Sequence, residues 1–413
     1  MASASTQAGQ PVHKGKVATW LSKVFELNPA RLNWLRGVWI LDLMLVPLVV
    51  LLSIGYSQYL LSALFGVLFP GLTDPGGSYG SRVSRIAVFG LIGAGLTALA
   101  FGIAADAWGW LVLATFAVTL AGGLAIMFGV HRFVAGLLLN IWFIVALGTA
   151  FGFHQFNLDH RVQITSYTWA QVAAWAGGTA LWIAVTFIGW LIRGRRDAPP
   201  PVAELPGDTS RRKPTRPVIM FALIRAVVIA GTAALAYGLN LSYGHWMSVA
   251  AIVAMKPSLE QSTVVAVQRL IGALIGAAAA ALLLLIPVSE HGLKLLSTTN
   301  ALAFVALVFF MHAAAIRLWN YAFYCAAVAA GVLILTDLLQ PNNYGAEGYR
   351  LLWTLCGVGI AVVVMLLAGL LAKRTPKAKP QPPADVPAQR KTTAEQDLAS
   401  RSGHQAGPGT SGP

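Results

Sequence analysis

The residues best suited to chemistry gather in one short stretch of the chain. Tyr243, His245 and Trp246 lie close together, and Lys256 and Ser258 follow after an apolar run. Aromatic and imidazole rings stack on aromatic ligands, and a lysine beside a helix start attracts an anion. This stretch therefore predicts a site for an organic anion, with an aromatic ring as its apolar part.

Each of these residues also has a structural explanation. Trp246 is ordinary in an interfacial aromatic belt, and Lys256 can extend to lipid headgroups. Arg269, a further candidate cation, opens a helix whose Gly272 and Gly276 have the spacing that lets helices pack closely. For the glycines packing is the default interpretation, and for the other residues both interpretations stay open.

Four more residues are candidates outside this stretch. Asp42 lies inside an apolar segment, where a charged carboxylate costs about 2.5–3.5 kcal/mol, so it is the candidate for proton coupling. Arg132 and Arg317 lie in very short loops and are interpreted either as topology signals or as a cytoplasmic vestibule for anions. Tyr56 is the counterpart of Tyr243 in the first half of the chain.

Several kinds of function find no support in the motifs. No phosphate-binding loop, metalloprotease helix or nucleophile elbow is present, and the histidines match no metal-binding spacing. The two cysteines, Cys325 and Cys356, both lie in apolar runs. The sequence therefore predicts no enzyme, no cofactor and no metal.

The elements that position these residues are membrane helices. Hydrophobic residues make up 57% of the 413 residues, charged residues only 11%, and the mean hydropathy is +0.68. A membrane-spanning helix needs about 20 apolar residues. We find ten apolar runs of that order and two shorter ones, 59–70 and 246–255, which predicts an all-α protein with about twelve transmembrane helices.

The net charge of +14 reflects topology and does not predict a nucleic-acid partner. If the N-terminus is cytoplasmic and all twelve segments cross, 26 of the 29 basic residues lie on the inner side. The N-terminal segment is polar and has no signal-peptide core. We therefore expect a multi-pass inner-membrane protein with both termini in the cytoplasm.

The sequence also indicates two halves that derive from one duplicated unit. A polar, proline-rich linker, 193–217, separates a first membrane repeat, 29–192, from a second, 218–372, with cytoplasmic tails at 1–28 and 373–413, the second of them disordered. Landmark residues recur 184 to 189 positions apart. The matched pairs are Arg36 and Arg225, Tyr56 and Tyr243, Pro70 and Pro257, Arg85 and Arg269, Arg132 and Arg317, and Arg161 and Arg350. Six crossings in each half predict parallel repeats.

Each repeat contains one short segment, which points to a transport site. Ten to twelve helical residues cover about 15–18 Å, roughly half of the hydrocarbon layer. After the second segment, Pro257 and the Ser258-x-x-Gln261 pattern predict the start of a new helix. Paired short or broken segments are typical of substrate sites, so we expect the two to face one another across a pathway.

The stretch 243–276 resembles a known family. Its pattern Trp-x-x-x-x-Ala-x-x-x-x-x-Pro-Ser, followed by Arg-x-x-Gly-x-x-x-Gly, is similar to the signature of the fusaric-acid-resistance-like family, also called aromatic acid exporters. The resemblance implies a membrane protein of two halves that exports aromatic carboxylic acids; a plant branch conducts organic anions. The signature positions are Trp246, Pro257, Ser258, Arg269, Gly272 and Gly276.

Together these observations predict a secondary transporter that exports organic anions, with aromatic carboxylates as the implied class. Two alternatives stay open. One is an anion channel of the same fold, and the other is a non-transporting membrane subunit whose basic tail recruits a partner. The expected partners are a small organic anion and the lipid bilayer, and a homo-oligomer or an accessory subunit is compatible with the sequence.

Overall fold

The computed structural model describes residues 22, 26–27, 32–74, 76–156, 164–195, 215–255, 259–284, 298–317, 319–339 and 345–374. Two compact units are distinguished. Met1–Leu367 contains all the described helices except the end of the last one, and Ala368–Pro413 contains that end. Across the described residues the chain is all-α and forms no strand, as predicted. Most of the two predicted tails and of the linker lies outside the described residues, so the predicted domain boundaries stay predictions.

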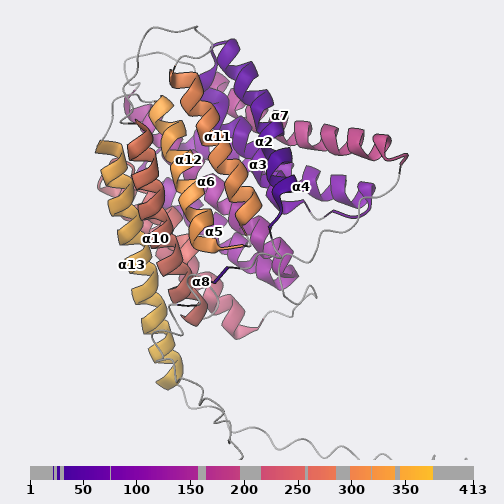
Figure 1. Ribbon diagram of the computed structural model, residues 1–413. Coiled ribbons are helices and arrows are strands. Elements are labelled where there is room, and N and C mark those ends of the chain that lie inside the picture. Colours follow the sequence, from indigo (N-terminus) through magenta and orange to yellow (C-terminus); the bar gives the residue numbers. More distant parts are fainter. Residues whose placement is uncertain are drawn as a thin grey trace, which may run out of the picture. The chain divides into compact units, whose positions relative to one another are not determined.

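Twelve α-helices and two short 3-10 helices make up the described part of the chain (Figure 1). In the first half they are α2 (Trp34–Ser53), η2 (Ser57–Tyr59), α3 (Leu60–Thr73), α4 (Tyr79–Ile103), α5 (Trp108–Leu124), η3 (Ala125–Phe128), α6 (Val130–Phe156) and α7 (Ile164–Ile192). In the second half they are α8 (Arg216–Gly238), α9 (His245–Ala254), α10 (Leu259–Leu284), α11 (Thr298–Ile316), α12 (Tyr321–Leu339) and α13 (Gly345–Arg374).

Polar residues and prolines start several of these helices. The side-chain oxygen of Asn33 accepts a hydrogen bond from the backbone N–H of Arg36 at 3.1 Å and caps α2. Asn320 caps α12 in the same way, accepting from the backbone N–H of Ala322 at 2.9 Å. Helix α10 begins at Leu259, directly after the Pro257 and Ser258 positions where the sequence predicts a helix start.

Seven helices in the described residues are long and apolar enough to cross a membrane: α2, α4, α5 with η3, α6, α7, α8 and α13. Their outer faces carry large exposed apolar side chains, for example Leu91 of α4 at 73% and Leu35 of α2 at 72% exposure. Such surfaces are costly in water and favourable in lipid. The chain is therefore a multi-pass membrane protein.

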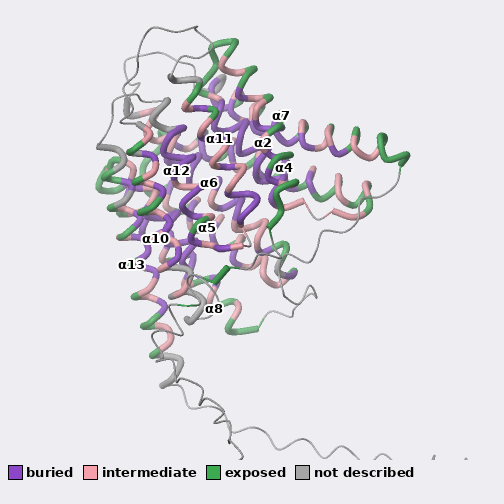
Figure 2. The backbone as a smooth tube through the Cα atoms, in the orientation of Figure 1, coloured by how far each residue is buried: buried purple, intermediate pink, exposed green. Residues whose placement is uncertain are grey.

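The two short helices form the interior of the first unit. In α3 every residue from Leu60 to Leu72 is buried, and in α9 every residue from Met247 to Ala254 is buried. Figure 2 shows this burial as the purple core, with exposed residues on the surrounding helices. Helices buried on all sides need close neighbours, which small residues at the helix contacts make possible.

Close approach of glycines holds each short helix. A Cβ on Gly66 of α3 would collide with the carbonyl of Trp175 on α7, and a Cβ on Gly357 of α13 would collide with the carbonyl of Met247 on α9. The predicted packing role of Gly272 and Gly276 is confirmed, because both lie directly against the backbone of α12.

Helices of the first half of the chain also contact helices of the second half. Helix α2, the first of its half, packs against α11, the fourth of the other half. Reciprocally, α8 packs against α5. Within the second half, α10 and α11 both pack against α12, and Figure 1 shows the three side by side. Between these layers the short helices enclose the candidate site.

Candidate functional site: an apolar cavity with arginines at both ends

A cavity of about 480 Å³ lies between α3, α6 and the helices from α9 to α13. This volume falls within the range of about 300–1,000 Å³ typical of small-molecule sites. Apolar side chains dominate its walls, and the few polar groups among them are three arginines, two tyrosines, Gln268, Thr354 and the indole N–H of Trp246. An apolar cavity with a few convergent polar groups is suited to an amphiphilic ligand.

Both short helices supply one face to this cavity. On α3 the lining residues are Phe65, Leu68, Phe69 and Leu72. On α9 they are Trp246, Val249 and Val253. These spacings of three, four and seven residues place the side chains on one side of each helix. The remaining faces pack against neighbouring helices, so the short helices are walls of the cavity.

One end of the cavity is defined by Arg350 at the beginning of α13. Its side chain is 8% exposed, and its guanidinium carbon lies 5.1 Å from the ring centre of Trp246 and 5.6 Å from that of Tyr243. Cation–π contacts of this kind hold a guanidinium flat against the rings. The indole Nε1–H of Trp246 is buried and has no hydrogen-bond acceptor among the described residues. This end therefore offers a fixed cation and an available N–H donor.

The other end contains two arginines and two tyrosines. Arg269 of α10 and Arg317 after α11 line the cavity together with Tyr321 and Tyr324 of α12. The phenol of Tyr324 lies within electrostatic range of both arginines. Arg317 donates a hydrogen bond from Nη1 to the carbonyl oxygen of Leu72, in the last turn of α3, at 3.3 Å. The Nε of Arg269 is buried without an acceptor in the described part of the chain.

Chain direction shows that these are opposite ends. Helices α9 and α13 run in the same direction, because Arg350 contacts Trp246 and, further along, Gly357 contacts Met247 and Ala250. Arg350 thus lies at the beginning of α9. Arg269 lies level with the start of α12, because further along α10 Gly272 contacts Ala322 and Gly276 contacts Ala326. Positive charge therefore borders the apolar cavity on both sides, an arrangement that favours an anion with an apolar body.

Residues 228–364 match the sequence model of a family described as fusaric acid resistance protein-like. Over these residues the chain is similar to that family. The matched region begins in α8 and ends in α13, and it therefore includes Trp246, Arg269, Arg317 and Arg350. No curated protein and no solved structure matches the chain.

The fusaric acid resistance protein-like region brings only part of the predicted site together. Trp246, Arg269 and Arg317 line the cavity, and Tyr243 reaches it through Arg350. His245 takes another direction: its ring is close enough to Gly148 of α6 that a Cβ there would overlap it. The imidazole still lies near the indole of Trp246, with ring centres 5.3 Å apart.

Three candidates lie away from the cavity lining. Tyr56 is 50% exposed, with its ring centre 5.9 Å from that of Tyr59. Arg132 is exposed and stacks over Phe128, with its guanidinium carbon 5.6 Å from the ring centre. Asp42 lies on the exposed face of α2. The structure does not bring these three to the site, and the coupling role of Asp42 stays a prediction.

The remaining two candidates, Lys256 and Ser258, lie outside the described residues, so their predicted roles stay predictions. No group of three or more histidine, cysteine, aspartate or glutamate side chains in the described part of the chain is arranged to hold a metal ion.

Sequence reasoning missed several cavity residues. The sequence indicates Arg350 as the repeat counterpart of Arg161 and as one of the three basic residues left on the outer side, but not as a site residue. Gln268 directly precedes Arg269 and was not singled out. Tyr321 and Tyr324 begin a helix, where tyrosines are ordinary, so no pattern distinguishes them.

Proposed function

We propose that the chain is a secondary transporter that exports organic anions, with aromatic carboxylates as the substrate class. The membrane helices and the family support a transport role. The observation that carries the substrate class is the cavity itself, an apolar chamber of about 480 Å³ with arginines at both ends.

The lining residues fit the two parts of an aromatic carboxylate. A guanidinium binds a carboxylate through two parallel hydrogen bonds, and it keeps its charge even when buried. The side chains of Phe65, Phe69 and Phe310 offer faces and edges to an aromatic ring. Trp246 adds an indole N–H beside Arg350. A purely apolar ligand would leave these cations and donors unused.

Equivalent contacts in the two halves support the proposal of twelve crossings in two parallel repeats. Arg36 of α2 donates from Nη2 to the carbonyl oxygen of Gly71 at 2.7 Å, and Arg225 of α8 donates from Nη2 to that of Ile252 at 3.2 Å. Each acceptor is two residues before the end of its short helix. The contacts of α2 with α11 and of α8 with α5 agree with this, because each joins the first helix of one half to the fourth helix of the other.

Alternating access in such a protein moves the two halves around a central site. The bond from Arg317 to Leu72 links the cavity to α3 directly. At 3.3 Å it is long, so a carboxylate entering from this end competes for Arg317 at small cost. Binding of the anion then releases the end of α3, which is the movement that opens or closes a wall of the cavity.

We place the protein in the inner membrane with both termini in the cytoplasm. The support is the distribution of basic residues, which cluster in the segments that this orientation leaves inside. In this orientation the Arg269 and Arg317 end faces the cytoplasm and the Arg350 end faces outward. The cytoplasmic end would then load the anion, and the Arg350 end would release it.

The direct test is flux through purified full-length protein in phospholipid vesicles loaded with labelled benzoate. We expect saturable efflux above that of protein-free vesicles, and a change in rate when a pH gradient is imposed if protons are coupled. Absence of flux for benzoate-like acids under both conditions contradicts the proposal. Single-channel currents without proton movement would instead identify an anion channel.

A further inference from the structure

Two cations lie at the same level at one end of the transport cavity. Arg317 lies in the turn between α11 and α12. Arg269 lies beside the same turn, because Gly272, three residues later on α10, packs against the backbone of Ala322 at the start of α12. The phenol of Tyr324 interacts electrostatically with both arginines. The two guanidinium groups therefore border the same part of the cavity.

No acidic side chain balances these two charges among the described residues that line the cavity. Arg317 donates a hydrogen bond to the carbonyl oxygen of Leu72, which is an uncharged acceptor. Arg269 has no ion pair and no hydrogen bond with any described residue, and its Nε is buried. Like charges in an apolar environment are costly without a counter-charge. This end of the cavity therefore offers two positive charges that a ligand can balance.

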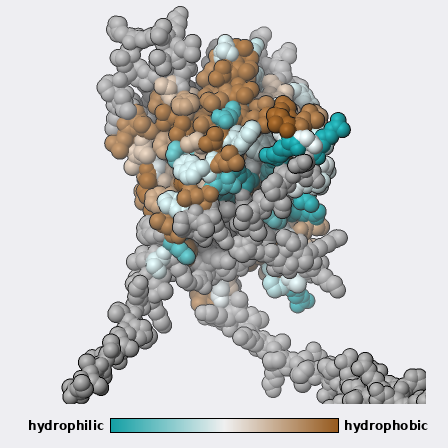
Figure 3. Space-filling view, turned by 45° about the vertical axis from the view of Figure 1, so that its right-hand side comes forward, coloured by the Kyte–Doolittle hydropathy of each residue, from teal (hydrophilic) through white to brown (hydrophobic). Residues whose placement is uncertain are grey.

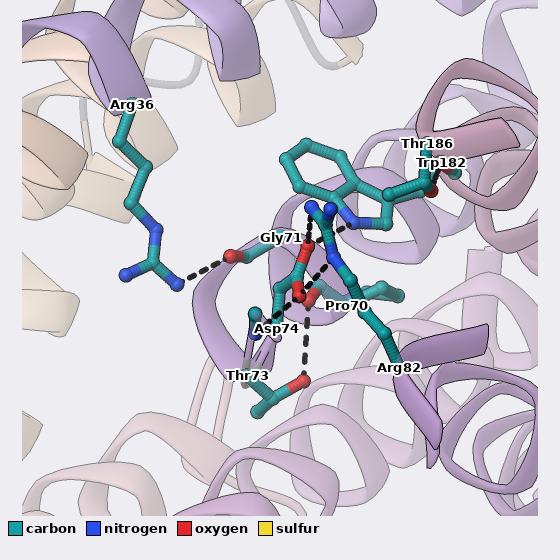
Figure 4. A network of polar contacts seen from close by, with 9 residues as sticks. Arg36, Pro70, Gly71, Thr73, Asp74, Arg82, Trp182 and Thr186 are labelled. Atoms are coloured by element: carbon teal, nitrogen blue, oxygen red, sulfur yellow. Dashed lines mark hydrogen bonds and ion pairs between the residues drawn. The ribbon is translucent and has the colours of Figure 1, made fainter. Parts of the chain in front are cut away.

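A second cavity, of about 390 Å³, shows how an arginine is balanced elsewhere in the chain. It lies between α2, the turn from α3 to α4, and the end of α7, and it shares no lining residue with the transport cavity. There Asp74 accepts from Nε of Arg82 at 2.6 Å and pairs with its Nη2 (Figure 4). The indole N–H of Trp182 donates to the same carboxylate at 3.1 Å. Helix α10 is the third helix of its half, as α4 is of the other, but its Arg269 has no such acid among the described residues.

The surroundings of the two arginines are apolar. Inside the cavity, Phe310 and Ala313 of α11 and Val328 of α12 line the turns that adjoin them. On the outside, hydrophobic surface covers most of the described helices on the face shown in Figure 3, and hydrophilic atoms gather in one band. A charged hydrogen bond is stronger in such an environment than in water. A ligand for this end therefore needs two negative charges for the arginines and an apolar body for the walls.

Two neighbouring carboxylates on one aromatic ring meet both requirements. Each guanidinium can bind one carboxylate through two parallel hydrogen bonds. The phenols of Tyr321 and Tyr324, which line the same end, can donate to the remaining carboxylate oxygens. The ring of the ligand can pack against the ring of Phe310. A monocarboxylate such as benzoate would bind only one of the two guanidinium groups in this way.

We propose that the preferred substrate is an aromatic dicarboxylate whose two carboxylates are on adjacent ring atoms. This inference rests on the proposed transport of aromatic carboxylates and narrows its substrate class. Both carboxylates lie at the end of the cavity that contains Arg269 and Arg317, and the ring points toward Phe310. The paired guanidinium groups select for the second charge, and the apolar walls select for the aromatic body.

Equilibrium binding to the purified full-length protein in detergent tests this inference separately from transport. Labelled phthalate, benzoate and monomethyl phthalate are compared at neutral pH, because the methyl ester keeps the shape of phthalate and removes one charge. We expect phthalate to bind about tenfold more tightly than the other two, since it forms a second charged, hydrogen-bonded pair. Equal affinity for the three ligands overturns the inference, whereas benzoate efflux from vesicles would still support the proposed function. Tighter binding of phthalate without flux of any of the three would support the inference and contradict transport.

Two variants show whether the arginines are responsible for this preference. We expect Arg269→Gln and Arg317→Gln each to lower the ratio of phthalate affinity to benzoate affinity to about one, because only one guanidinium remains. A general structural disturbance would weaken both ligands and keep the ratio. Arg132→Gln removes an exposed arginine outside both cavities and should also keep the ratio. A ratio that survives both Arg269→Gln and Arg317→Gln, or displacement of phthalate by an equal concentration of inorganic phosphate, overturns the proposal.

Discussion

At the scale of single residues, the second half of the chain concentrates the groups suited to an organic anion. The guanidinium of Arg350 contacts the rings of Tyr243 and Trp246, while Arg269 and Arg317 border the opposite end of the cavity. A buried cation is costly unless it has partners, and the two aromatic rings provide cation–π contacts for Arg350. In the proposed function an incoming carboxylate would add charged hydrogen bonds.

Replacing Arg350 should therefore weaken transport directly. We expect Arg350→Gln to raise the KM for benzoate efflux about tenfold, because it removes a charged hydrogen-bond donor and a cation–π contact. Arg350→Lys keeps the charge but loses the planar fork of donors. Its KM should lie between that of the unaltered protein and that of Arg350→Gln. The matched control is Arg85→Gln, an exposed arginine on α4 that lines neither cavity. An unchanged KM for Arg350→Gln would show that Arg350 does not meet the substrate.

Trp246 allows a finer test, because its ring and its N–H group can be separated. Trp246→Phe keeps an aromatic face for Arg350 but removes the indole N–H donor, and a neutral hydrogen bond is worth about 1 kcal/mol. We expect the KM for benzoate to rise about fivefold with little change in kcat. Trp110→Phe, at a 62% exposed tryptophan of α5, should leave both values as they are. If Trp246→Phe and Trp110→Phe have the same KM for benzoate, the indole N–H of Trp246 does not contact the substrate.

At the scale of elements, the short helices are the interior of the protein and the longer ones carry the lipid-facing surface. Helix α9 is ten residues long and α3 fourteen, too short to cross a bilayer unaided. Both are nevertheless buried along their length, and both contribute one face to the same cavity. Their position depends on close backbone contact with α7 and α13.

That contact predicts that replacement by alanine has very different effects on stability at two nearby glycines of α13. A Cβ at Gly357 would collide with the carbonyl of Met247, whereas a Cβ at Gly359 would meet nothing within 4 Å. We expect Gly357→Ala to destabilise the protein by about 1–3 kcal/mol, as overpacking does, and to lower its thermal unfolding midpoint in detergent. Gly359→Ala should leave the midpoint unchanged or slightly higher. Equal midpoints would show that α9 and α13 are further apart.

At the scale of the whole molecule, the proposed symmetry requires each short helix to connect opposite sides of the membrane. The turns before α3 and α9 would then both be outside, and the segments before α4 and α8 both inside. Equivalent arginine contacts at the ends of α3 and α9 support this arrangement.

Labelling of single cysteines tests this topology. In a background with Cys325 and Cys356 replaced by alanine, cysteines are placed at Ser57 and Ser242, before the short helices, and at Ser78 and Thr215, before α4 and α8. All four positions are exposed. An impermeant maleimide added to intact cells should label the first two only, and the other two after permeabilisation. Labelling of all four from one side would contradict the twelve-crossing arrangement.

The sequence by itself determined the class of the protein and the presence of two short segments. A helix surrounded by lipid needs a long apolar run whatever it packs against. Composition and the length of apolar runs therefore indicate a membrane protein before any contact is known. The start of α10 and the packing role of Gly272 and Gly276 also follow from local chemistry, because proline and glycine act on their own backbone.

Only the tertiary structure decided which side chains meet. His245 and Trp246 are neighbours, but successive residues on a helix point about 100° apart, so the two rings cannot share one direction. The space beside Gly148 receives the imidazole, and the indole turns to the cavity. Arg350 joins Trp246 from a helix roughly a hundred residues later in the chain, and Asp42 faces outward although its segment is apolar. The orientation of a helix about its own axis is set by the helices packed against it, and no local pattern contains that information.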